Sequence, residues 1–172
     1  MENFEEYSNY LTNIKYPINY SRNRLKVNAS DVHRGLALGT IRVWPHYRKN
    51  KDDTFRKCCA LKWVKYQNVF DISTKLFNEY SPEPDFKWTT IQYNYNQVSK
   101  KHKDGNNVGE SYIIGLGDYT GGRLKVWHND EDEEPEYIDI KNNFYKFDGS
   151  NKYHESEEFE GTRLSLIYFN VL

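Results

Sequence analysis

The chain has 172 residues, of which 28% are charged and 16% are aromatic, and 15 of them are tyrosines. A chain of this length folds as one domain with its own core, and so many aromatic residues exclude an intrinsically disordered chain. No apolar run is long enough to span a membrane, and the start of the chain lacks the basic and apolar regions of a signal peptide. We therefore expect no membrane partner.

The cysteines favour a reducing compartment. The only two, Cys58 and Cys59, are adjacent in the sequence. Adjacent cysteines rarely bridge each other, so no disulfide framework is expected. Together with the missing signal peptide, this predicts an intracellular protein, cytoplasmic or nuclear.

The net charge of −1 conceals an uneven distribution of charge. Residues 1–104 contain 18 Lys/Arg and 11 Asp/Glu, a balance of +7, whereas residues 105–172 contain 6 and 14, a balance of −8. The basic excess lies in residues 21–65, which have 12 Lys/Arg against 3 Asp/Glu and include Trp44 and Trp63. Basic residues interleaved with aromatic ones suit a polyanion, so this segment predicts a nucleic-acid partner. A solvated basic face is the alternative.

The first 86 residues are predicted to form supporting helices and two strands. The spacing of apolar residues predicts a helix over 4–16 that Pro17 ends. Residues 24–27 and 35–44 are typical of strands.

A longer helical segment, either one helix or two, follows Asp52-Asp53-Thr54, which suits a helix N-cap. We expect it to end before Ser81-Pro82 and to pack against a sheet. Its apolar residues recur at near-helical intervals: Phe55, Cys59, Tyr66, Phe70, Phe77 and Tyr80.

From residue 87 onward, short alternating segments are separated by turn residues at steps of about ten. Eight strands are predicted, over 87–96, 98–103, 110–116, 122–127, 136–140, 143–147, 152–157 and 162–171. This spacing indicates a sandwich or jelly roll. Because the helices come first, the fold class is α+β, a single domain over 1–172 with helical support in 1–86 and a jelly-roll core in 87–172.

One set of polar residues suits a metal. His102 and Asp104 are two residues apart, so in an extended chain their side chains share one face. His154 follows 52 residues later, which leaves room for the strands that would bring it back beside them. Two imidazoles and one carboxylate bind one face of a ferrous ion and leave positions for a co-substrate and dioxygen. A second His-x-Asp tripeptide, His128-Asn129-Asp130, lies too close to His154 and is interpreted as a solvated strand end.

A co-substrate anchor is predicted in the last strand. Arg163 and Ser165 share one face of it, and a guanidinium beside a hydroxyl is suited to a buried carboxylate. Tyr112 and Asn94 are further candidates to line the same pocket, with ordinary inward polar positions as the alternative.

The order and spacing of His102, Asp104, His154, Arg163 and Ser165 resemble the motif of the Fe(II)/2-oxoglutarate-dependent dioxygenases. The resemblance covers residues 87–172 and implies a double-stranded β-helix. It implies iron held by the two histidines and Asp104, 2-oxoglutarate anchored by Arg163 and Ser165, and oxidation of a C–H bond with O2. Another keto acid, or ascorbate, is left open as co-substrate.

Within that family, residues 102–109 resemble the iron motif of the TET/JBP nucleic-acid base oxygenases. With the basic segment 21–65, this favours a nucleic acid or nucleobase as substrate. A protein hydroxylase of the prolyl or lysyl type is the alternative, and a jelly-roll binding module without turnover is the non-enzymatic one.

Overall fold

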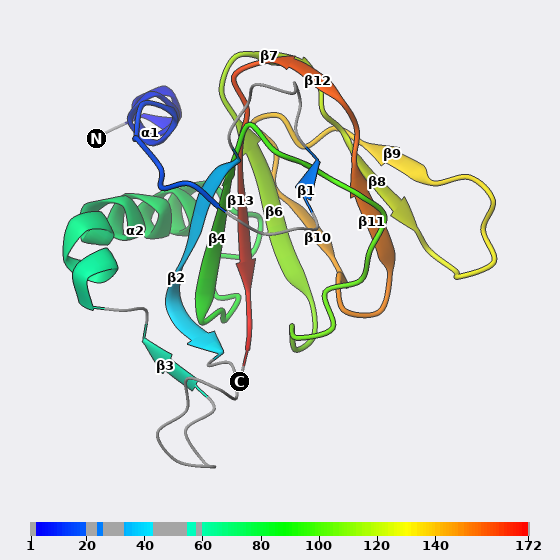
Figure 1. Ribbon diagram of the computed structural model, residues 1–172, viewed down its shortest axis with the longest axis horizontal. Helices are drawn as coiled ribbons and strands as arrows, with labels where there is room; N and C mark the ends of the chain where they lie inside the picture. Colours follow the sequence, from blue (N-terminus) through cyan, green and yellow to red (C-terminus); the bar gives the residue numbers. More distant parts are fainter. Residues whose placement is uncertain (1–2, 20–23, 26–32, 43–54, 58–59, 172) are drawn as a thin grey trace.

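The computed structural model describes residues 3–19, 24–25, 33–42, 55–57 and 60–171 (Figure 1). The predicted N-cap at 52–54 and the pair Cys58 and Cys59 lie outside the described residues, as does most of the basic segment 21–65. None of the described helices is long and apolar enough to cross a membrane.

The larger sheet forms one wall of the molecule, and its strands pair in the order β10-β6-β13-β4-β2-β3, all antiparallel. The strands are β2 (Arg34–Arg42), β3 (Phe55–Lys57), β4 (Thr90–Tyr95), β6 (Ser111–Leu116), β10 (Tyr145–Phe147) and β13 (Leu164–Phe169). β13, near the end of the chain, lies between β6 and β4. Strands from distant parts of the sequence are therefore neighbours, as a jelly roll requires.

A smaller antiparallel sheet packs against part of the larger one (Figure 1). It has the order β11-β8-β9, with β11 (Tyr153–Ser156), β8 (Leu124–Trp127) and β9 (Glu136–Ile138). Apolar side chains from both sheets form a cluster between them: Ile113, Leu124, Val126, Ile138, Ile140 and Phe147. The chain thus has the predicted α+β class with a jelly-roll core.

Two short antiparallel pairs complete the strands: β1 (Arg24–Leu25) with β5 (Val98–Ser99), and β7 (Tyr119–Gly121) with β12 (Phe159–Gly161). All eight strands predicted from residue 87 onward are present, each of them shorter than expected. β7 and β12 lie between the predicted strands, where the sequence indicated only turns. They pair with each other at the end of the jelly roll near Arg163.

Both helices lie on the outer face of the larger sheet (Figure 1). α1 (Phe4–Thr12) begins with a capping box in which the Asn3 side chain accepts from the Glu6 backbone N–H and the Glu6 side chain accepts from the Asn3 backbone N–H. It ends at Thr12, before the predicted boundary at residue 16.

α2 (Ala60–Tyr80) ends before Ser81, as predicted, and has non-helical backbone angles at Tyr66, where φ is −116° and ψ is 15°. The prediction that Phe55 belongs to this helix is wrong, because residues 55–57 pair with β2 as an edge strand. Near-helical spacing does not exclude a strand when a neighbouring strand supplies the hydrogen bonds.

The helices and the larger sheet enclose the main core. Leu164, Leu166 and Tyr168 of β13 face the helices, and the Tyr168 hydroxyl donates to the Ser73 carbonyl of α2 at 2.8 Å. Because side chains alternate along a strand, Ser165 and Ile167 face the other way, into the jelly roll. This alternation leaves one face of β13 free to line a site.

Candidate active site

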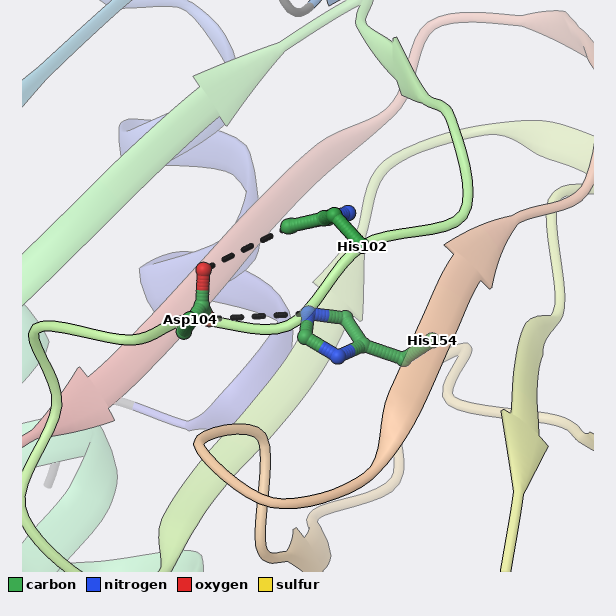
Figure 2. A group of neighbouring side chains, drawn as sticks. All are labelled: His102, Asp104 and His154. Atoms are coloured by element: carbon green, nitrogen blue, oxygen red, sulfur yellow. Dashed lines mark ion pairs between the residues drawn. The ribbon is translucent and has the colours of Figure 1, made fainter. Parts of the chain in front are cut away.

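The structure brings His102, Asp104 and His154 together, as the sequence predicts (Figure 2). One potential ligand atom from each lies within 4.8 Å of the other two. His102 and His154 exchange two backbone hydrogen bonds of 3.0 and 2.9 Å, and their ring centroids are 4.2 Å apart. Among the described residues this is the one group of three or more His, Cys, Asp or Glu side chains that could hold a metal ion.

The local backbone differs from the prediction. Regular pairing in β5 stops at Ser99, and His102 is an isolated bridge opposite His154 rather than part of a strand over 98–103. Asp104 lies in the turn that follows, where its backbone N–H donates to the Gly149 carbonyl at 2.8 Å. His102 and Asp104 therefore converge because β11 holds the segment of His102 and the loop after β10 holds the segment of Asp104.

Each imidazole is oriented by a backbone carbonyl. The Nδ1 atom of His102 lies 2.6 Å from the Lys100 carbonyl oxygen, and that of His154 lies 3.1 Å from the Lys152 carbonyl oxygen. A carbonyl oxygen only accepts, so both Nδ1 atoms carry the proton. Both Nε2 atoms face the Asp104 carboxylate, at 3.4 and 3.5 Å. In the metal-free protein a proton on Nε2 is donated to this carboxylate, and loss of that proton leaves a lone pair on each Nε2 for a metal.

The Asp104 carboxylate is held in its ionised form. Burial favours the neutral acid, but hydrogen bonds from His102 and His154 and the charge of the two imidazoles outweigh it, so the pKa of Asp104 lies well below its usual value. Asn107 donates a further hydrogen bond to Oδ2 at 3.3 Å. An ionised carboxylate between two imidazoles is the donor set that suits ferrous iron.

The three side chains open into a cavity of about 120 Å³ inside the jelly roll. Asn94 and Ser165 lie directly opposite each other on β4 and β13, and both line the cavity. The other lining residues are Gln92, Gln97, Ser99, Asn107, Ile113, Leu124, Phe147, Ser156, Ile167 and Phe169. Apart from the triad itself, the described residues of the lining are uncharged.

Arg163 lies two residues before Ser165 and is 1% exposed. Its guanidinium carbon lies 5.6 Å from the ring centroids of Tyr119 and Phe159, and its Nε and Nη1 atoms have no hydrogen-bond partner. Burial lowers the pKa of Arg163, and the electrostatic interaction with Tyr119 opposes this shift. A buried cation with two unpaired N–H groups is costly unless an anion joins it, so this arrangement fits a carboxylate.

Glycine at position 122 makes room for the guanidinium. A Cβ atom on Gly122 would lie 3.0 Å from both Cδ and Nε of Arg163, and the φ angle of 68° also favours glycine.

Tyr119 is a neighbour of Arg163 that the sequence did not indicate. Its hydroxyl is buried without a hydrogen-bond partner, close to Gly115 and beside Arg163. It lies in β7, and the glycines around it are typical of a turn rather than of a strand. A second unpaired polar group next to Arg163 supports a polar ligand at this end of the jelly roll.

Tyr112 does not line the cavity, and that prediction is wrong. Its ring packs against Phe77 and Phe86, with centroid distances of 5.5 and 5.0 Å, and its hydroxyl donates to Glu83 at 3.0 Å. Its neighbour Ile113 faces the cavity instead. Both faces of β6 are buried and apolar, so the sequence pattern did not distinguish them.

The second His-x-Asp tripeptide is solvated, as predicted. His128 is paired with Glu136, and Asp130 accepts from Lys103 at 2.6 Å. Neither side chain belongs to the metal-binding group.

No family model matches the chain, and no curated protein matches it in sequence. Solved structures do match it. The structure of OsALKBH1 aligns with 98% of this chain and 93% of its own, at 10% identity and a TM-score of 0.53. A 2OG-Fe(II) oxygenase family oxidoreductase from Burkholderia pseudomallei aligns over 96% and 77%, at 15% identity and a TM-score of 0.53.

A prolyl-4-hydroxylase from Pseudomonas putida aligns with 96% of this chain and 84% of its own, at 11% identity and a TM-score of 0.52. NgTET1, in complex with 5mC DNA, aligns over 80% and 60%, at 17% identity and a TM-score of 0.51. The chain therefore has the double-stranded β-helix fold of the Fe(II)/2-oxoglutarate oxygenases, with a His-Asp-His group like the one that the family motif implies. The similar scores of these neighbours do not rank them.

Proposed function

We propose that this protein is an Fe(II)- and 2-oxoglutarate-dependent dioxygenase that oxidises a C–H bond. The observation that supports this most strongly is Arg163, a buried cation without a partner for Nε and Nη1, two residues before the cavity-lining Ser165. A metal triad alone would suit many functions. A triad together with a buried receptor for a carboxylate suits a metal enzyme with an acidic co-substrate.

In this proposal His102, Asp104 and His154 hold the iron through Nε2 and carboxylate oxygen atoms. The carbonyl groups of Lys100 and Lys152 keep each imidazole in the tautomer that can ligate. When bound, ferrous iron and 2-oxoglutarate supply the activation of dioxygen, and the protein supplies orientation and a cavity that limits access of water.

The distal carboxylate of 2-oxoglutarate binds Arg163 and Ser165, the pair that the sequence predicts as its anchor. The guanidinium neutralises the charge and the hydroxyl donates a further hydrogen bond. Asn94 is a third candidate because its amide lines the cavity opposite Ser165; its Oδ1 accepts from Gln92 at 3.1 Å, which leaves the Nδ2 donors for a ligand. Tyr119 joins this set through its unpaired hydroxyl.

The substrate is proposed to be a nucleic acid or nucleobase. The basic composition of residues 21–65 supports a polyanion, and the uncharged lining of the cavity suits a neutral base. The described lining offers no acidic side chain besides Asp104, which the metal would neutralise, so a lysyl side chain would find no counter-charge. Within the protein-substrate alternative we therefore favour prolyl or another uncharged residue over lysyl.

The test measures succinate formed from 2-oxoglutarate by the purified protein with Fe(II) and O2, with oligonucleotides or proline-containing peptides added. We expect succinate to depend on iron, and the added substrate to gain one oxygen atom by mass spectrometry. Asp104→Ala should abolish both, whereas Asn143→Ala, an exposed amide outside the cavity, should not. An iron-loaded protein that forms no succinate with any addition would instead indicate a binding module.

A further inference from the structure

The side chain of Asn107, which is not part of the triad, lines the cavity and donates a hydrogen bond to a triad side chain. Its Nδ2 atom lies 3.3 Å from Oδ2 of Asp104. Gly149 also approaches this carboxylate, but it has no side chain with which to donate. Asn107 is therefore placed to act on the metal site through Asp104.

The loop that carries Asn107 is fixed by its backbone. The Asn107 N–H donates to the Asp104 carbonyl at 2.9 Å, and the next residue, Val108, donates to the Asn170 carbonyl at 2.9 Å. The backbone N–H of Asp104 donates to the Gly149 carbonyl at 2.8 Å. These three bonds do not involve the Asn107 side chain, so we expect them to persist when it is truncated. The loop thus has backbone bonds of its own that place the amide near Asp104.

The two oxygens of Asp104 have different surroundings. Oδ1 lies 3.4 Å from His102 Nε2, whereas Oδ2 lies 3.5 Å from His154 Nε2 and also accepts from Asn107. A hydrogen bond to one oxygen limits rotation of the carboxylate and withdraws electron density from that oxygen. The other oxygen then offers the better lone pairs to a metal.

We propose that Asn107 is a positioning residue that holds Oδ2 of Asp104 and thereby presents Oδ1 as the single carboxylate ligand of the metal. This inference rests on the proposed metal site and goes beyond it, because it assigns the coordination mode of Asp104 to a side chain that does not touch the metal. One-oxygen binding leaves more of the metal's positions for 2-oxoglutarate and dioxygen than two-oxygen binding would.

The test uses Co(II) as the probe, in protein freed of metal and without 2-oxoglutarate. Binding is followed by calorimetry and by the visible absorption of Co(II), which responds to coordination number. Asn107→Ala should weaken Co(II) binding by about 10- to 100-fold, the usual effect of losing a group that orients a ligand. The Co(II) spectrum should also change towards a higher coordination number, as the released carboxylate binds through both oxygens.

Val108→Ala is the matched control, because Val108 follows in the same loop, is 53% exposed, and keeps its backbone bond to Asn170. It should leave affinity and spectrum unchanged. Asn107→Ala with wild-type affinity and spectrum would overturn the inference, and so would an equal loss in Val108→Ala, which would indicate an effect of the loop. If the wild-type protein binds no Co(II), the proposed metal site itself fails, and the inference with it.

Discussion

Replacing Arg163 with methionine should stabilise the ligand-free protein and remove its response to 2-oxoglutarate. Arg163 is 1% exposed, and its Nε and Nη1 atoms have no partner. Each unpaired buried N–H costs about 1–3 kcal/mol. The cation–π contacts with the Tyr119 and Phe159 rings offset about 0.5–2 kcal/mol of this cost. Methionine fills much of the same space without a charge, so Arg163→Met should gain about 1–4 kcal/mol.

The same substitution should remove the anchor for the co-substrate. Two charge-assisted hydrogen bonds contribute about 1.5–3 kcal/mol each, so their loss weakens 2-oxoglutarate binding by about 10²- to 10⁴-fold. At a hundred times its dissociation constant, a ligand stabilises the native state by about 2.7 kcal/mol. For a domain of this size that raises the melting temperature by about 5–11 °C.

The assay is thermal unfolding of the Mn(II)-loaded protein under nitrogen, with and without 2-oxoglutarate. Wild type should melt at a higher temperature when 2-oxoglutarate is added. Arg163→Met should start from a higher melting temperature and show no such shift. Arg123→Met is the control, because Arg123 is half-exposed and pairs with Glu157 at 2.7 Å on the surface. A destabilised Arg163→Met protein that still responds to 2-oxoglutarate would refute the reasoning.

The other predictions concern the triad, the core and the basic segment. His154→Ala should abolish metal binding by calorimetry while far-ultraviolet circular dichroism stays that of the wild type; retained binding would contradict the ligand assignment. Because the pKa of Asp104 is lowered in the folded state, its contribution to the stability of the metal-free protein is fully present above about pH 4 and is lost as the pH falls further. The stability difference between wild type and Asp104→Asn, from urea unfolding, should therefore shrink on acidification; a difference that grows would contradict this. Tyr168→Phe removes the hydrogen bond to Ser73 and should cost about 1–2 kcal/mol, against no measurable change for the exposed Tyr137→Phe. If residues 21–65 bind nucleic acid, the affinity should fall steeply with salt concentration in filter binding, and salt-independent binding would argue against a phosphate contact.

The metal triad was predictable because the types of its residues and their order along the chain indicate a metal site. His102 and Asp104 are two residues apart, and His154 lies far enough along the chain to return beside them. The structure reaches this convergence through a backbone bridge and a turn rather than through a regular strand. The side-chain types therefore predicted the site better than the predicted secondary structure did.

That Arg163 and Ser165 share one face of the last strand was predictable for a different reason. Leu164 and Leu166 alternate with them, so the last strand divides into a core face and a cavity face. On β6, by contrast, Tyr112 and Ile113 are both apolar enough for a core, and the sequence could not tell which one faces the cavity.

The residues that sequence reasoning missed depend on contacts between distant segments. Tyr119 stands among glycines that favour a turn, and only pairing with residues 159–161 makes its segment a strand. Asn107 lies between two predicted strands, where the sequence indicated only a turn, and its proposed role depends on the distance from Nδ2 to Asp104. Local patterns contain no information about either contact.

The most direct test of the central claim is an anaerobic titration of the Fe(II)-loaded protein with 2-oxoglutarate, followed by visible absorption. A 2-oxo acid that chelates ferrous iron gives a charge-transfer band, so the account predicts a saturable band in the wild-type protein that is absent in Asp104→Ala and needs far more 2-oxoglutarate in Arg163→Met. An iron-loaded wild-type protein that shows no such band, or a band that Asp104→Ala retains, would contradict the account.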